Sequence, residues 1–210
     1  MDGLIGRAVH HEDMSDELPV IGVLNLQGAV REHLAALDRL GLPNRAVRMA
    51  EELNEVDGLI IPGGESTTIG KLLDRRGLGE RIKQRAREGM AVFGTCAGLI
   101  LLAQRIELSD QSSLALMDVG VKRNAFGRQI ESFEAEVSIP RLGEEPVPAV
   151  FIRAPIVTDV GAGVEVMAEY EGRIIAVRQG NLLGASFHPE LTDDTRMHRF
   201  FARMAASARG

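Results

Sequence analysis

The sequence has 210 residues, of which 45% are hydrophobic and 26% are charged, and its formal net charge is −6. This length and composition fit one globular domain, and the acidic balance argues against a nucleic-acid-binding protein. No apolar run reaches the roughly 20 residues that span a bilayer, so the chain is expected to be cytoplasmic and not to bind a membrane. Residues 1–18 are polar, lack the apolar stretch of a signal peptide and are interpreted as a flexible leader, with residues 19–210 as the domain.

The first half of the chain predicts strands and helices in alternation. Apolar runs bounded by glycine or proline predict strands, and apolar residues at helical spacing predict the helices between them. Ser66 or Thr67 is expected to cap the second helix. The strands are expected at residues 20–26, 45–49, 58–61 and 90–93, and the helices around residues 34–40, 66–73, 80–88 and 99–103. This alternation predicts a mostly parallel sheet that is flanked by helices on both faces.

The second half of the chain predicts mainly strands. Glu171 and Gly172 are expected to form the turn of a hairpin between two of them. A last helix is expected from about Asp193 to Ala206, with Thr192 as its cap. The strands are expected at residues 132–139, 149–153, 164–170, 173–179 and 182–186. No repeat or linker divides the chain, so a single α/β domain is predicted.

Cys96 is the only cysteine, which excludes a disulfide within the chain and a zinc site built from several cysteines. It lies in residues 94–98 (GTCAG), between a predicted strand and a predicted helix. A nucleophile on such a tight turn needs small neighbours, and glycines stand on both sides. The start of the helix favours the reactive thiolate, and a neighbouring N–H group can hold an oxyanion. A structural turn around a buried cysteine is the alternative, but the strand–turn–helix context favours a nucleophile.

A cysteine nucleophile needs a base, and His188 is the best candidate among the histidines. It follows a predicted strand, and ligands of open α/β sheets bind at the carboxyl ends of strands. Glu190 lies two residues further on, where its carboxylate can orient the imidazole and stabilise its charged form. The other histidines lie in the leader or within predicted helices, where ordinary surface positions are expected: His10, His11, His33 and His198.

A second glycine turn, residues 62–66 (PGGES), also ends a predicted strand. Gly63 and Gly64 allow the backbone to approach a ligand closely, and their N–H groups can complete an oxyanion hole. As a bare glycine turn this is a weak signal, because many loops between a strand and a helix look like it.

Together, three segments resemble the class I glutamine amidotransferases, which use a Cys-His-Glu triad to hydrolyse the side-chain amide of glutamine. These segments are residues 62–67 (PGGEST), 94–98 (GTCAG) and 187–190 (FHPE). The resemblance implies a single flavodoxin-like α/β domain in which Cys96 attacks the amide carbon, His188 transfers the proton and Glu190 supports His188.

Four further segments are similar to the glutaminase subunit of pyridoxal 5′-phosphate synthase, the PdxT family. They are residues 26–33 (LQGAVREH), 123–129 (RNAFGRQ), 132–134 (SFE) and 151–155 (FIRAP). The resemblance runs from about residue 20 to the final helix. It implies an oxyanion hole made by the N–H groups of Gly64 and Ala97. The positions that match the family's glutamine-binding residues are Gly64, Glu65, Ser66, Arg123, Ile152 and Arg153.

The resemblance also implies a reaction and a partner. L-glutamine and water would give L-glutamate and ammonia, with no metal or organic cofactor. The ammonia would pass to a synthase subunit of the PdxS type within a hetero-oligomer, for the synthesis of vitamin B6. The turn at residues 27–29 resembles the family segment that faces this partner. Weak activity of the isolated chain and activation by the synthase are expected.

Three alternatives remain open at this point. An amidotransferase that supplies a different synthase would keep the triad, but the RNAFGRQ and FIRAP segments favour the vitamin B6 pathway. A thiol hydrolase or protease would act on peptides or esters and need no partner. A binding protein on a degenerate scaffold would be expected to lack a triad residue, whereas all three are present.

Overall fold

The structure is a computed structural model, and it describes residues 18–125 and 132–208. Most of the predicted leader lies outside these ranges, as does part of the RNAFGRQ segment, residues 126–129. The boundary between a leader and a domain therefore stays a prediction.

The main sheet has the strand order β2-β1-β3-β4-β12-β11-β9-β6-β5, and β10 pairs with β11. The strands from β2 to β12 in this order run parallel, whereas β11 and β9 pair antiparallel with their neighbours. The strands are β1 (Ile21–Leu24), β2 (Asn44–Val47), β3 (Gly58–Ile61), β4 (Ala91–Thr95), β5 (Ala103–Ile106), β6 (Met117–Lys122), β9 (Ile156–Val160), β10 (Glu165–Tyr170), β11 (Arg173–Gln179) and β12 (Leu182–Ala185).

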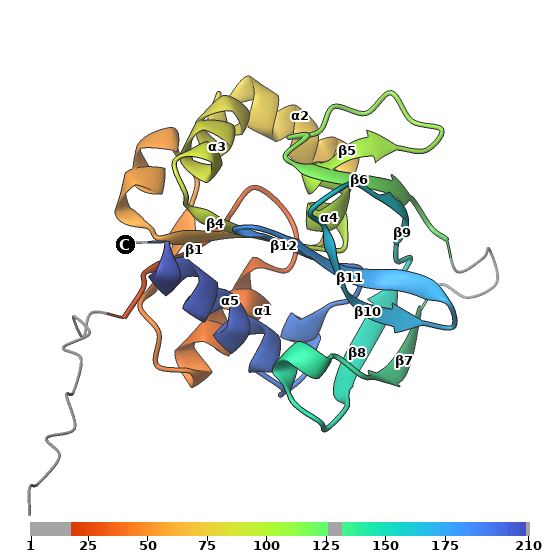
Figure 1. Cartoon of the computed structure of the whole chain (residues 1–210). Helices are drawn as coiled ribbons and strands as arrows, with labels where there is room; N and C mark the ends of the chain where they lie inside the picture. The colour runs from red at the N-terminus through yellow and green to blue at the C-terminus, as the bar shows by residue number, and fades with distance from the viewer. Residues whose placement is uncertain (1–17, 126–131, 209–210) are drawn as a thin grey trace, which may run out of the picture.

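Helices cover both faces of this sheet, which confirms the predicted α/β class. In Figure 1, α2, α3 and α4 lie on one side of the central strands, and α1 and α5 lie on the other. The helices are α1 (Val30–Arg39), α2 (Ser66–Arg75), α3 (Leu78–Arg87), α4 (Ala97–Leu102) and α5 (Arg196–Ser207), with short 3-10 turns η1 (Ala50–Glu55), η2 (Pro140–Leu142) and η3 (Pro189–Leu191).

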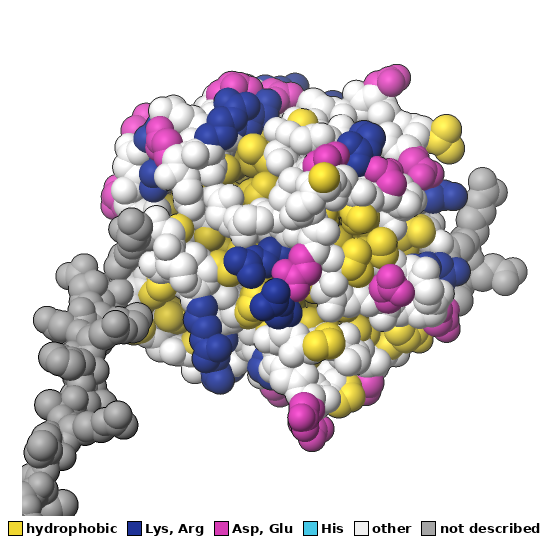
Figure 2. Space-filling model, in the orientation of Figure 1, with side chains coloured by type: hydrophobic (Ala, Val, Ile, Leu, Met, Phe, Trp, Pro, Cys, Tyr) yellow, Lys and Arg dark blue, Asp and Glu magenta, His cyan; other side chains and the backbone are white. Residues whose placement is uncertain are grey.

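The surface carries both signs of charge. On the face drawn in Figure 2, basic and acidic side chains are intermixed over the helices and strands. Within the described ranges, no helix combines the length and the apolar character that crossing a bilayer requires.

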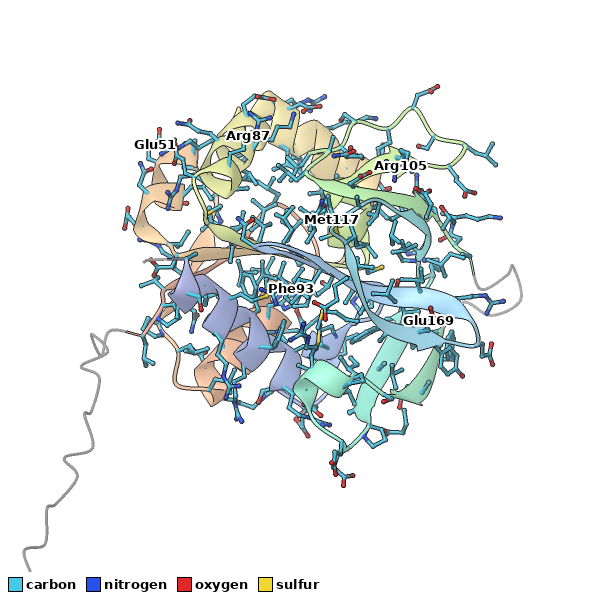
Figure 3. All side chains as sticks on the ribbon, in the orientation of Figure 1. Glu51, Arg87, Phe93, Arg105, Met117 and Glu169 are labelled. Carbon is cyan, nitrogen blue, oxygen red and sulfur yellow. The ribbon has the colours of Figure 1, made fainter. Side chains whose placement is uncertain are left out.

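Two apolar cores fill the space between the sheet and its helices. Met117 belongs to the core under α2, α3 and α4, and Phe93 belongs to the core against α1 and α5. Figure 3 places these two side chains on opposite sides of the sheet. Strands buried on both faces read as continuous apolar runs, as in β3 (GLII) and β4 (AVFGT).

A separate two-stranded antiparallel sheet, β7 (Ser132–Val137) and β8 (Val147–Ile152), lies beside the main sheet. Aromatic rings attach it there. The Phe151 ring of β8 lies 5.8 Å from that of Tyr170 in β10 and 5.8 Å from that of Phe187, just after β12. Such contacts add about 0.5–1.5 kcal/mol each to the burial of the rings. The hairpin is therefore held firmly against the segment that follows β12.

Two helix starts differ from the sequence prediction. The cap of α2 is Glu65, not Ser66 or Thr67: its carboxylate accepts hydrogen bonds from the N–H groups of Thr67 at 3.1 Å and Thr68 at 2.8 Å. A charged acceptor also interacts favourably with the positive end of the helix. The final helix α5 begins at Arg196, because the Thr192 hydroxyl accepts from the N–H of Asp194 at 3.2 Å within a turn before the helix.

Candidate active site

Three adjacent parallel strands bring the predicted site together. β3, β4 and β12 are neighbours in the sheet, so their carboxyl ends lie side by side. The glycine turn follows β3, Cys96 follows β4 and His188 follows β12. The N–H of Cys96 donates to the carbonyl of Ala185 at 2.8 Å, which fixes the two loops relative to each other.

The backbone at Cys96 has the form that the glycine pattern predicts. Cys96 has φ 47° and ψ −100°, a conformation that non-glycine residues rarely adopt, and it directly precedes α4. Gly94 and Gly98 pack too closely for side chains: a Cβ on Gly98 would lie 2.1 Å from the carbonyl oxygen of Ile61. The sharp turn therefore depends on glycine at both flanks and leaves the thiol at the edge of the sheet.

His188 and Glu190 form the expected pair. Nδ1 of His188 donates to Oε1 of Glu190 at 2.7 Å, and both residues are buried, with 7% and 4% exposed. The backbone N–H of His188 donates to the carbonyl of Val150 in β8 at 2.8 Å. Burial lowers the pKa of His188, but its interactions with Cys96 and Glu190 outweigh this effect and raise the pKa to about 10. These interactions favour the imidazolium form of His188, which lies between Cys96 and the Glu190 carboxylate.

This raised pKa predicts how stability depends on pH. The ordinary pKa is 6.5 and the folded value is about 10, so the stabilisation is complete below about pH 6.5 and is lost as the pH rises toward 10. We expect the free energy of unfolding of the unsubstituted chain to fall over this interval relative to that of His188→Gln. Chemical denaturation at several pH values measures both curves, and parallel curves would contradict the assignment. The groups facing His188 are Cys96, Glu190 and His33.

A cavity of about 370 Å³ opens beside Cys96 and His188. Every residue predicted to bind glutamine or its oxyanion lines this cavity, whereas Glu190 lies behind His188. The lining includes Gly64, Glu65, Ser66, Ala97, Arg123, Ile152 and Arg153, and also Gln27, Asn124 and Leu191. The carbonyl of Ile152, at the end of β8, lies 3.7 Å from the Cys96 sulfur. The hairpin thus forms one wall of the site.

Several cavity side chains are already engaged with each other. Oε1 of Gln111 accepts from the hydroxyl of Ser66 at 3.0 Å and from Nη1 of Arg123 at 3.3 Å. Nη2 of Arg123 lies 3.6 Å from the Glu65 carboxylate, and hydrogen bonds from Thr68 lower the pKa of that carboxyl to about 2. Gln111 was not singled out from the sequence, since it lies in a loop outside any motif. It holds Ser66 and Arg123 at the rim.

The prediction that His33 and His198 are ordinary surface residues is wrong. Both are 0% exposed. Nδ1 of His33 lies 2.9 Å from Nε2 of His198, and Nε2 of His33 lies 3.2 Å from the Thr95 hydroxyl and 3.5 Å from Oε2 of Glu190. The burial of His33 could have been predicted from helical spacing, because Val30, His33 and Leu37 lie on one buried face of α1.

Residues 23–207 match the model of the SNO glutamine amidotransferase family. The chain belongs to this family. It is 56% identical over 189 residues to "Pyridoxal 5′-phosphate synthase subunit PdxT" of Niallia circulans, covering 90% of this chain and 99% of that one. It is 57% identical over 198 residues to the protein of that name in Streptomyces coelicolor, covering 93% and 98%.

Solved structures agree with this family membership. A crystal structure described as a glutamine amidotransferase superposes with a TM-score of 0.85 at 49% identity, covering 88% of this chain and 98% of that one. A GMP synthase subunit from Thermoplasma acidophilum superposes with a TM-score of 0.68 at 17% identity, covering 91% and 96%. The second likeness concerns the fold alone. The predicted family and fold class are both confirmed.

Proposed function

We propose that this chain is a glutaminase that hydrolyses L-glutamine to L-glutamate and ammonia, with Cys96 as nucleophile, His188 as general base and acid, and Glu190 as the residue that orients His188. The observation that carries the proposal is the meeting of Cys96 and His188 at one cavity edge, with Glu190 behind His188 in a hydrogen bond of 2.7 Å. Membership of a glutamine amidotransferase family gives the class of reaction.

The reaction proceeds through a thioester. The Cys96 thiolate attacks the amide carbon of glutamine, and the resulting oxyanion is held by the backbone N–H groups of Gly64 and Ala97. His188 donates its proton to the departing nitrogen, so the C–N bond breaks and ammonia leaves. His188 then takes a proton from a water molecule, which attacks the thioester, and the C–S bond breaks to release glutamate and restore the Cys96 thiolate beside a protonated His188.

Glutamine occupies the cavity lined by Glu65, Ser66, Arg123, Ile152 and Arg153. Arg123 and Arg153 both line the cavity, and either guanidinium is suited to the substrate α-carboxylate, because the two groups form charge-assisted hydrogen bonds. The carboxylate of Glu65 is engaged in capping α2, so Glu65 offers the substrate its backbone rather than its charge.

The ammonia passes to a synthase subunit of the PdxS type, which makes pyridoxal 5′-phosphate. The names of the relatives support this partner, since each is described as a subunit of pyridoxal 5′-phosphate synthase. The turn Gln27–Gly28–Ala29 is the segment that meets the partner. It contacts the glycine turn directly, because Ala29 N–H donates to Gly63 O at 3.1 Å and Glu65 N–H donates to Gln27 Oε1 at 2.8 Å.

The test is glutamate release from glutamine by the purified chain, alone and with a PdxS-type synthase. We expect weak release by the chain alone and strong stimulation by the synthase. An unrelated amidotransferase partner, such as the catalytic component of GMP synthase, serves as the control for partner identity. Equal stimulation by both partners would contradict the vitamin B6 assignment, and no release with either would contradict the glutaminase.

A further inference from the structure

Two buried histidines lie directly behind the proposed triad, on helices far apart in the sequence. His33 belongs to α1 and His198 to α5, and both are fully enclosed. Burying an imidazole is unfavourable unless its polar atoms find partners. The His33 ring has contacts at both nitrogens: His198 on one side, and Thr95 and Glu190 on the other.

The chemistry of the neighbours fixes the hydrogen positions in this group of side chains. Oε2 of Glu190 is buried without a hydrogen-bond partner among the described residues, and it lies 3.5 Å from Nε2 of His33. Because a carboxylate can only accept, we assign a hydrogen to this nitrogen, which also lies 3.2 Å from the Thr95 hydroxyl. Nδ1 of His33 is then an acceptor and receives the N–H of His198 Nε2 at 2.9 Å. The remaining nitrogen of His198, Nδ1, is buried without a hydrogen-bond partner among the described residues, and in this arrangement it carries a lone pair rather than a hydrogen.

Electrostatics agree with two neutral rings. Burial lowers the pKa of His33, and it lowers the pKa of His198 to about 3. Burial opposes the charged form of Glu190, yet the hydrogen bond and positive charge of His188 help to hold its pKa below the usual range. The titratable and charged groups acting on this cluster are His188, Glu190, Glu32 and Arg39.

His33 therefore touches both loops of the site at once. Glu190 orients the base, and Thr95 directly precedes the nucleophile. Resting on the proposed glutaminase function, we propose that His33, with its tautomer set by His198, is a positioning residue that holds Glu190 and Thr95 in the arrangement that Cys96 and His188 require. His33 does not line the cavity, so it acts through these two residues and does not contact glutamine.

The experiment compares His33→Leu with His33→Gln, each assembled with a PdxS-type synthase. Leucine fills the space without a donor, whereas the glutamine amide can still donate toward Glu190. We expect His33→Leu to lower kcat about 10- to 100-fold, as small misplacements of catalytic groups do, with KM nearly unchanged. We also expect the acidic limb of its kcat–pH profile to move to higher pH, because the buried Glu190 carboxylate loses a stabilising neighbour.

His33→Gln should recover most of kcat and the original pH profile. A folded His33→Leu with unchanged kcat, or a glutamine variant no better than leucine, would overturn the proposal. A second test does not depend on whether the variants fold or on enzyme activity. Nitrogen-15 NMR of the histidine rings in the unsubstituted protein reports which ring nitrogen carries the hydrogen, and we expect a hydrogen on Nε2 of His33 and none on Nδ1. The opposite tautomer would overturn the proposal. Absence of glutamate release by the unsubstituted complex would instead count against the proposed function. In that case the NMR measurement of the His33 tautomer would still test the position assigned to His33.

Discussion

Replacing Cys96 by alanine is expected to lower glutamate release by at least about four orders of magnitude, as loss of a nucleophile does in enzymes of this type. Alanine removes the sulfur but leaves the cavity and its lining intact, so glutamine should still bind with an affinity close to that of the unsubstituted chain. Steady-state kinetics of the complex with a PdxS-type synthase measure the first quantity, and calorimetric titration with glutamine measures the second.

The control for this prediction is Cys96→Ser. This variant keeps a side chain of similar size but replaces the thiol by a hydroxyl, which is a weaker nucleophile. Because Cys96 is the only cysteine, covalent labelling by an electrophilic glutamine analogue can be assigned without ambiguity. We expect one label per unsubstituted chain and none on Cys96→Ala. Release of glutamate at an undiminished rate by the alanine variant would reject Cys96 as the nucleophile.

The second large effect is expected at Gly98. An added Cβ would lie 2.1 Å from the carbonyl oxygen of Ile61, which is backbone and cannot rotate away. We expect Gly98→Ala to lower the free energy of unfolding by about 3 kcal/mol, as overpacking of a buried site does. For a chain of this length, that corresponds to a fall in Tm of about 10 °C. Activity should fall too, because α4 must shift and carries the Cys96 turn with it.

Gly79→Ala is the matched control for Gly98→Ala. Gly79 also lies in a helix, α3, but a Cβ there would come no closer than 3.7 Å to the nearest neighbouring atom. We expect this variant to keep or raise the stability by up to about 1 kcal/mol, since alanine favours the helix over glycine. Thermal unfolding of both variants decides the point, and similar Tm values for the two would mean that the close approach at Gly98 is unimportant.

The parts of the site that the sequence predicts are those with short-range signals. Five consecutive residues around Cys96 specify the strand, the turn and the helix, because the glycines are dictated by local geometry. His188 and Glu190 are two residues apart, so their pairing also follows from a local turn. The family was predicted from the segments that resemble it, and the mostly parallel sheet was predicted from the alternation of strands and helices; both are confirmed. The catalytic and binding roles of the individual residues stay predictions.

The parts that were missed depend on contacts over long separations. His33 and His198 are 165 positions apart, and neither carries a motif, so their meeting appears only when α1 and α5 pack on the same face. The strands β5 and β9 were missed because exposed polar residues interrupt their apolar pattern. The strand β6 was missed although it is mostly buried, because Asp118 and Gly120 interrupt its apolar run. The cap of α2 was mispredicted because Ser66 and Thr67 are themselves common cap residues. In the structure the carboxylate of Glu65, the residue before them, forms the cap.

The position of β12 in the sheet has a consequence for the order in which the protein matures. This strand, Leu182–Ala185, is inserted between β4 and β11 and is followed by the helix that carries His198. A chain emerging from the ribosome therefore contains Cys96 long before β12 and His188, the proposed base, have been made. Under the proposed mechanism, an incomplete chain that lacks His188 cannot hydrolyse glutamine, so ammonia is formed only once synthesis of the chain is nearly finished.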